Sequence, residues 1–93
     1  MLPEHVFAPR DAPRLASGFR LQFEPAQSAW VILYPEGMVK LSHSAGEIMQ
    51  RLDGHSTVDA VVQSLEHAFP GADLRGDVLD FLAVARERGW IVC

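Results

Sequence analysis

Apolar and polar residues alternate along the first half of the chain in a way that predicts a three-stranded sheet. Residues 19–23 alternate with period two, and residues 29–34 contain five consecutive large apolar side chains, a pattern typical of a strand buried on both faces. Pro35 and Gly37 fit the second and fourth positions of a tight turn that leads into a third strand at 38–41. The pattern predicts an antiparallel meander with its third strand at an edge.

Apolar residues recur at helical spacing in the second half of the chain, which predicts three helices. Ser44 and Glu47 have the spacing of a capping box, which opens the first helix. The predicted helices extend from Ser44 to Gly54, from Ser56 to Pro70, and from near Asp73 to Gly89. A three-stranded antiparallel meander followed by a three-helix bundle is an α+β, winged-helix-like fold.

Chain length and proline content divide the sequence into a tail and one domain. Ninety-three residues suffice for a single core, since a chain of this size buries about 60 % of its unfolded surface. Residues 1–14 hold Pro3, Pro9 and Pro13 among charged side chains, and each proline removes a backbone donor. We expect residues 1–14 to form a flexible N-terminal tail and residues 15–93 to form the single folded domain.

The sequence has no pattern typical of secretion or membrane insertion. Residues 1–10 lack the apolar run of a secretory signal, and no segment approaches the roughly 20 apolar residues that a membrane-spanning helix needs. The single cysteine, Cys93, excludes an internal disulfide and favours a reducing compartment. We expect a cytoplasmic protein that does not enter the membrane.

The net charge is −4, and the excess of acidic residues lies in the helical half. Residues 1–41 balance four bases against four acids, whereas from residue 42 onward four arginines face eight acids. This half would repel a phosphate backbone, which argues against a nucleic-acid partner. Asp73, Asp77 and Asp80 complement the dipole of the third helix; recognition of a basic partner is the alternative, and catalysis is the weakest interpretation.

No side chains form a recognisable catalytic or metal-binding motif. The histidines are scattered without metal-ligand spacing, and neither the serines nor Cys93 have the neighbourhood of an activated nucleophile. The glycines are dispersed, so there is no phosphate-binding loop. We therefore predict no catalytic residue, no metal, no cofactor and no enzymatic activity.

The large aromatic residues have two interpretations. Trp30, Tyr34 and Trp90 are expected to fill the core of a small domain, with a ligand pocket as the alternative. Apolar surface left uncovered by three short helices would favour a partner or self-association through the second strand, the N-terminal tail or residues 90–92. A homodimer is therefore a further hypothesis.

Several segments together resemble the pyrroloquinoline quinone biosynthesis protein D (PqqD) family. They are Trp30 to Gly37 (WVILYPEG), Leu41-Ser42 with Ser44-Ala45 and Glu47-Ile48, Asp53-Gly54, Asp77-Val78 with Phe81-Leu82, and Gly89-Trp90. The similarity extends over about residues 13–92. Gly46 in the first helix and residues 55–57 at the start of the second depart from the family pattern, but neither lies in the expected binding cleft.

The resemblance implies a peptide chaperone, a recognition element for ribosomally made, post-translationally modified peptides (RiPPs). Members of the family bind the precursor peptide of the cofactor pyrroloquinoline quinone (PQQ) and present it to a radical S-adenosylmethionine (SAM) enzyme. That enzyme crosslinks a Glu and a Tyr within the peptide, while the chaperone does no chemistry. Related elements bind the leader peptide as an added strand in the cleft between the third strand and the third helix.

The residues themselves supply the parts of such a cleft. Backbone groups of Val39, Lys40 and Leu41 could pair with an extended peptide at the sheet edge. Leu79 and Ala83 lie about 100° from the core line of the third helix and would form the apolar wall, with two arginines beside them to meet acidic peptide side chains. The candidate peptide-binding residues are Met38, Val39, Lys40, Leu41, Arg75, Leu79, Leu82, Ala83 and Arg86.

Two other functions compete with this hypothesis. A winged-helix DNA-binding regulator fits the fold, but the aspartates near the start of the third helix stand where base contacts would form. A purely structural subunit of a larger enzyme would co-purify with that enzyme and show no affinity for a peptide.

Overall fold

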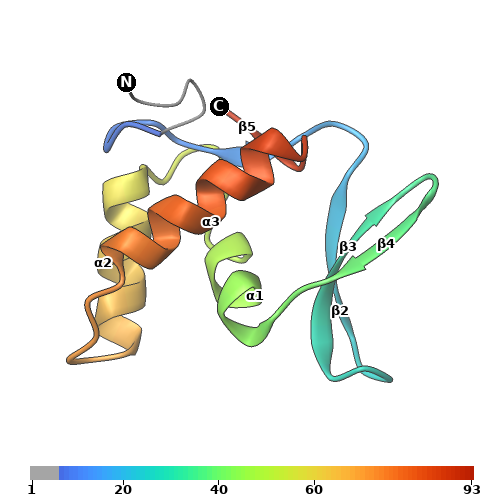
Figure 1. Ribbon diagram of the computed structural model, residues 1–93, viewed down its shortest axis with the longest axis horizontal. Coiled ribbons are helices and arrows are strands. Elements are labelled where there is room, and N and C mark those ends of the chain that lie inside the picture. Colours follow the sequence, from blue (N-terminus) through green and yellow to red (C-terminus); the bar gives the residue numbers. More distant parts are fainter. Residues whose placement is uncertain (1–6) are drawn as a thin grey trace.

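Three antiparallel strands form the sheet that the alternating pattern predicts (Figure 1). The computed structural model describes residues 7–93 and pairs β2 (Arg20–Glu24) with β3 (Ala29–Tyr34), and β3 with β4 (Gly37–Lys40). The predicted second strand matches β3 residue for residue, and the other two are displaced by one position. Val31 and Ile32 point to opposite faces and both have 0 % exposure, so the strand is buried on both faces as expected.

Three helices follow the sheet, which confirms the α+β prediction (Figure 1). They are α1 (His43–Met49), α2 (Val58–Ala68) and α3 (Arg75–Glu87). The order of the helices agrees with the prediction, although each begins or ends a few residues away from the predicted position. None of the helices in the described part of the chain is long and apolar enough to cross a membrane.

The start of α1 differs from the prediction. Ser42 is the N-cap, because its hydroxyl accepts a hydrogen bond from the backbone N–H of Ala45 at 3.1 Å. Glu47 forms no capping box with Ser44; its carboxylate instead pairs with Arg51 at 3.0 Å, one turn later. Both serines carry a good N-cap side chain, so the sequence alone could not choose between them.

The segment between α1 and α2 is held by one carboxylate. Asp53 accepts hydrogen bonds from the backbone N–H of Ser56 at 2.6 Å and of His55 at 2.8 Å, and these bonds lower the pKa of Asp53 below its usual range. Thr57, not Ser56, is the N-cap of α2. The carboxylate thus orders the short link that turns one helix into the next.

The core lies where the three helices meet the covered face of the sheet. Phe23 is opposite Trp30, and Leu21 is opposite Ile32, so these four side chains share one face. The most deeply buried side chains of the cluster on this face are Ile32, Met49, Val58, Val61, Val62, Val78, Leu82, Ala85 and Ile91. Helices and sheet are therefore joined by one continuous apolar cluster.

A second, two-stranded sheet joins the segment that precedes β2 to the C-terminal residues. β1 (Arg14–Leu15) pairs with β5 (Ile91–Val92) in antiparallel fashion. Figure 1 shows β5 alongside this N-terminal strand, close to the end of α3. Trp90 and Ile91 are 9 % and 1 % exposed, so residues 90–92 pack within the monomer and do not offer a surface for self-association.

The N-terminal residues that the structure describes are packed, which corrects the prediction of a flexible tail for residues 7–14. Phe7 is only 4 % exposed and belongs to the core cluster. The carbonyls of Pro9, Asp11 and Pro13 accept backbone hydrogen bonds from Asp59, Val58 and Gly54, respectively. A proline lacks a backbone N–H but keeps its carbonyl. A proline-rich segment can therefore still be held by hydrogen bonds that its carbonyls accept from other parts of the chain. Residues 1–6 lie outside the described residues.

Gly46 allows α1 to lie directly against β3. A Cβ atom at this position would stand 3.1 Å from Cδ1 and 3.2 Å from Cβ of Trp30. The Trp30 ring is in turn held by Phe23, whose ring meets it edge-on at 5.6 Å between centroids. The glycine weakens the helix locally but permits this close approach.

Replacing glycine by alanine should therefore have opposite effects in two helices. Gly76→Ala in α3, where a Cβ meets nothing within 4 Å, should raise the free energy of unfolding by about 0.5–1 kcal/mol through helix propensity. Gly46→Ala should lose that gain to crowding against Trp30 and leave the protein less stable than wild type. Urea unfolding measures both; equal stabilisation by the two alanines would contradict the tight contact.

Candidate functional site

The outer edge of β4 carries backbone groups that no other strand of the described chain pairs with. The Leu41 N–H donates to the Trp30 carbonyl at 2.9 Å, so Leu41 faces β3. Alternate residues of an antiparallel strand point their backbone groups the same way, so Val39 also faces β3, whereas Met38 and Lys40 face outward. Of the three backbone positions predicted to pair with a peptide, only Lys40 points outward, and Met38 joins it.

The β2 edge is also free of a partner strand in residues 7–93, but its surroundings differ. Arg20 and Glu24 lie with Gln22 on the face of β2 that points away from the helices, and charged side chains at an edge protect it from further pairing. β4 carries a single charged side chain, Lys40, and leads directly into the Ser42 cap of α1; Met38 of β4 and Phe23 of β2 are both 45 % exposed and do not separate the two edges. The β4 edge is the better candidate for an added strand.

The two arginines predicted to line the cleft are engaged elsewhere. A terminal nitrogen of the Arg75 guanidinium lies 2.6 Å from a carboxylate oxygen of Asp59 in α2. The Arg86 guanidinium lies over the ring of Phe7, 5.0 Å from its centroid. Both side chains therefore face α2 and the N-terminal segment.

The predicted apolar wall also falls on the wrong side of α3. Leu82 has 0 % exposure and cannot touch a peptide unless the core opens. Leu79 and Ala83 are half-buried, and Leu79 packs against the core cluster. Because residues three, four and seven positions apart share a helix face, Leu79 and Leu82 lie with Arg75 and Arg86. The structure does not bring this set to the β4 edge.

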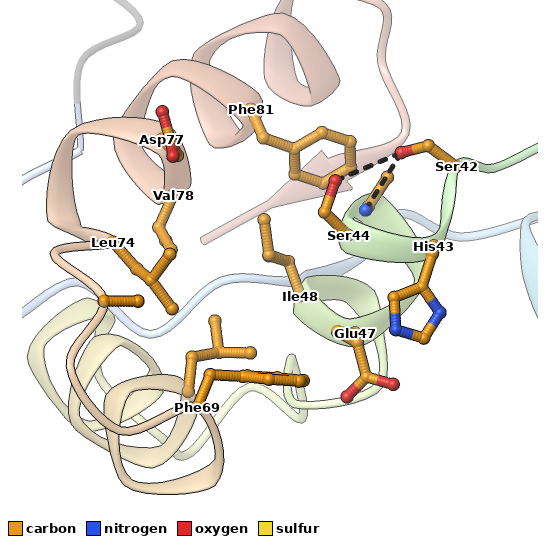
Figure 2. Close-up of a pocket in the computed structure, with 13 residues that line it drawn as sticks. Ser42, His43, Ser44, Glu47, Ile48, Phe69, Leu74, Asp77, Val78 and Phe81 are labelled. Atoms are coloured by element: carbon orange, nitrogen blue, oxygen red, sulfur yellow. Dashed lines mark hydrogen bonds between the residues drawn. The ribbon is translucent and has the colours of Figure 1, made fainter.

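The side chain that α3 does present near the end of β4 is Phe81. Figure 2 shows its ring turned toward Ser42 and Ser44, which open α1 immediately after β4. One turn further along the same stripe of α3, Val84 is 43 % exposed. Phe81 therefore borders the start of α1, and Val84 is the exposed apolar residue one turn further along α3.

A groove of about 450 Å³ begins at this point and extends between the three helices (Figure 2). Its floor and walls are mainly apolar. The residues that line it, called the helical groove below, are Ser42, His43, Ser44, Ala45, Glu47, Ile48, Leu65, Phe69, Ala72, Leu74, Asp77, Val78 and Phe81. Its size is typical of ligand-binding pockets, which hold about 300–1,000 Å³.

The helical groove could not be predicted from the sequence, because it depends on how the helices are oriented relative to one another. Phe81 has the helical spacing of a core residue, and the same stripe of α3 carries Asp77 and Val84. Which stripe faces α1 depends on how α3 is rotated in the bundle, and periodicity does not fix that rotation. The exposed Phe69, one residue before Pro70, was the one available hint of apolar surface at the end of α2.

The described residues offer little for catalysis. Among residues 7–93, no group of three or more His, Cys, Asp or Glu side chains is placed to hold a metal ion. Cys93 is exposed, and desolvation, followed by the nearby Asp11, raises the pKa of its thiol. A raised pKa reduces the thiolate fraction, so Cys93 has the character of an ordinary thiol and not of an activated nucleophile.

Comparison with known proteins identifies the family. The model described as "Coenzyme PQQ synthesis protein D (PqqD)" matches residues 29–91, which include β3, β4 and all three helices. The chain belongs to the PqqD family. The resemblance seen in the sequence is thereby confirmed.

Relatives of the family match nearly the whole chain. The "PqqA binding protein" of Azotobacter vinelandii is 54 % identical over 82 residues, which are 87 % of this chain and 89 % of that protein. The protein of the same name from Pseudomonas aeruginosa is 52 % identical over 80 residues, 85 % of this chain and 87 % of that protein. The similarity therefore extends beyond the region that the family model covers.

A solved structure shares the fold. The solution NMR structure of the PqqD truncation of Methylobacterium extorquens PqqCD superposes with a TM-score of 0.79 at 29 % identity and covers 96 % of this chain and 97 % of that one. That PqqD truncation is described as a functional and stand-alone RiPP recognition element. Nothing in these comparisons favours a DNA-binding regulator, and the exposed Asp77 and Asp80 on α3 would repel phosphates.

Proposed function

We propose that this protein is a peptide chaperone of PQQ biosynthesis that binds the ribosomal precursor peptide, PqqA, as a strand added to the edge of β4. The observation that carries the proposal is the close similarity, over almost the full chain, to proteins named for binding PqqA. The outward backbone groups of Met38 and Lys40 support the mode of binding, because they stand two residues apart on an edge without a partner strand in the described chain.

The side chains that accompany this edge differ from those expected from the sequence. An added strand would place alternate residues toward the helices, where Val39 of β4 and Phe81 and Val84 of α3 are partly or largely exposed. These residues replace Leu79, Leu82 and Ala83 as the proposed apolar wall. Arg75 and Arg86, engaged with Asp59 and Phe7, are no longer part of the proposed site.

The partner that receives the peptide in this proposal is the radical SAM enzyme of the pathway, which crosslinks a Glu and a Tyr of PqqA. The protein described here binds and presents the peptide and does no chemistry itself. The proposed place of action is the cytoplasm, where the precursor peptide is synthesised.

Titration with the peptide tests the proposal directly. Isothermal titration of this protein with the PqqA peptide of Azotobacter vinelandii should show saturable binding, and a peptide of scrambled sequence should not bind. Amide hydrogen exchange then locates the strand: the Met38 and Lys40 amides, which face outward in the free protein, should gain protection, while the Leu41 amide already donates to Trp30 and should change little. Protection gained on β2 instead would contradict the assigned edge.

A further inference from the structure

The helical groove continues the β4 edge into the helices. β4 ends at Lys40, and the groove begins at Ser42, His43 and Ser44, two to four residues further along the chain. An extended peptide that pairs with β4 and continues past Lys40 would therefore reach the groove within a few residues of its own length. The inference that follows rests on the proposed function, because it concerns the same bound peptide.

The lining of the groove indicates what it can hold. Phe69 is 40 % exposed and Phe81 is half-buried, and both border a space between Ile48, Leu74 and Val78 (Figure 2). When another apolar group covers apolar side chains that are open to water in a groove of this size, the burial stabilises the bound state. A large aliphatic or aromatic side chain suits the space in size and in chemistry.

The charges at the rim of the groove indicate which peptide residues can lie next to that apolar side chain. Glu47 and Asp77 are the carboxylates of the lining, and no lysine or arginine of residues 7–93 is part of it. Glu47 is paired with Arg51, whereas Asp77 is exposed and forms no ion pair with any described residue. A basic residue of the peptide near the apolar one would be attracted to this rim, and an acidic one would be repelled.

We propose that the helical groove binds one large apolar side chain of the precursor peptide, next to a basic residue, just beyond the segment that pairs with β4. The groove would then act as a second specificity element: the edge of β4 recognises backbone and accepts many sequences, whereas the groove accepts a particular kind of side chain. Strand addition alone would not distinguish the precursor from other extended peptides.

Filling the groove tests this proposal. Ala72→Trp should fill it from its exposed rim and weaken binding of the Azotobacter vinelandii PqqA peptide at least about tenfold, whereas Ala60→Trp, on an exposed position of α2 outside the groove, should change binding less than about twofold. Asp77→Lys should weaken binding about threefold to tenfold, and Asp80→Lys, exposed on the same helix but outside the lining, should have a smaller effect. If Ala72→Trp fails to fold, Ser44→Trp fills the groove from α1.

A double-mutant cycle with the peptide identifies the anchor. Each large apolar residue of the peptide is changed to alanine in turn; for one of them, the loss of affinity seen with wild type should disappear with Ala72→Trp. Wild-type affinity of Ala72→Trp and Ser44→Trp, with binding still dependent on the β4 edge, would overturn the groove proposal and leave the proposed function intact. Failure of the wild-type protein to bind the peptide would instead overturn the proposed function.

Discussion

Replacing Lys40 by proline is expected to weaken peptide binding at least about tenfold, or about 1.4 kcal/mol. Proline deletes the outward N–H of Lys40, and its ring occupies the space that an added strand needs. The ladder between β3 and β4 should survive, because the Leu41 N–H, which bonds to Trp30, is untouched and Lys40 faces away from β3. Isothermal titration measures the loss.

A matched variant separates the backbone from the side chain. Lys40→Ala removes the charge and keeps the N–H, so it should bind the peptide within about threefold of wild type. Circular dichroism shows whether both variants remain folded. If the wild-type protein binds the peptide, equal affinities of Lys40→Pro and Lys40→Ala would show that no strand is added at β4.

The second large effect concerns stability. Phe7→Ala should lower the free energy of unfolding by about 3 kcal/mol, and the midpoint of thermal unfolding by roughly 10 °C or more. Phe7 is 4 % exposed in the core cluster, and the substitution also removes the surface on which the Arg86 guanidinium lies at 5.0 Å.

Phe69→Ala is the matched control, because Phe69 is 40 % exposed and its loss leaves no comparable cavity. It should cost about 1 kcal/mol or less. A Phe7→Ala protein that unfolds at the temperature of wild type would contradict the packing of the N-terminal segment and would favour the flexible tail expected from the sequence. Thermal unfolding followed by circular dichroism compares the two variants under the same conditions.

The sheet could be predicted from the sequence because its signals are local. The five consecutive large apolar residues, the turn at Pro35 and Gly37 and the period-two alternation all lie within about twenty residues, and the structure has β3 at the predicted positions. The pairing of β1 with β5 joins residues near opposite ends of the chain. Strands of two residues are too short to show a period-two alternation of apolar and polar residues, so the sequence does not predict them.

The edge strand of the candidate site could be predicted from the sequence, but the residues that accompany it could not. The edge position of β4 follows from the order of the strands, but the choice between Val39 and Met38 as outward groups depends on which residues pair across β3 and β4, and composition does not fix that register. On α3, Leu79 and Phe81 both lie beside the core line. Only the positions of α1 and the N-terminal segment decide that Phe81 borders the groove and that Leu79 faces the other way.

The β1–β5 pair has a consequence for how this protein can be joined to others. Because Val92 pairs with Arg14, the C-terminal end leaves the domain from the small sheet, and β4 belongs to the other one. A fusion partner attached after Cys93 would be tethered beside this small sheet and leave the β4 ribbon unobstructed. The solved relative from Methylobacterium extorquens is a truncation of a longer protein, PqqCD, so a domain of this fold does occur joined to another.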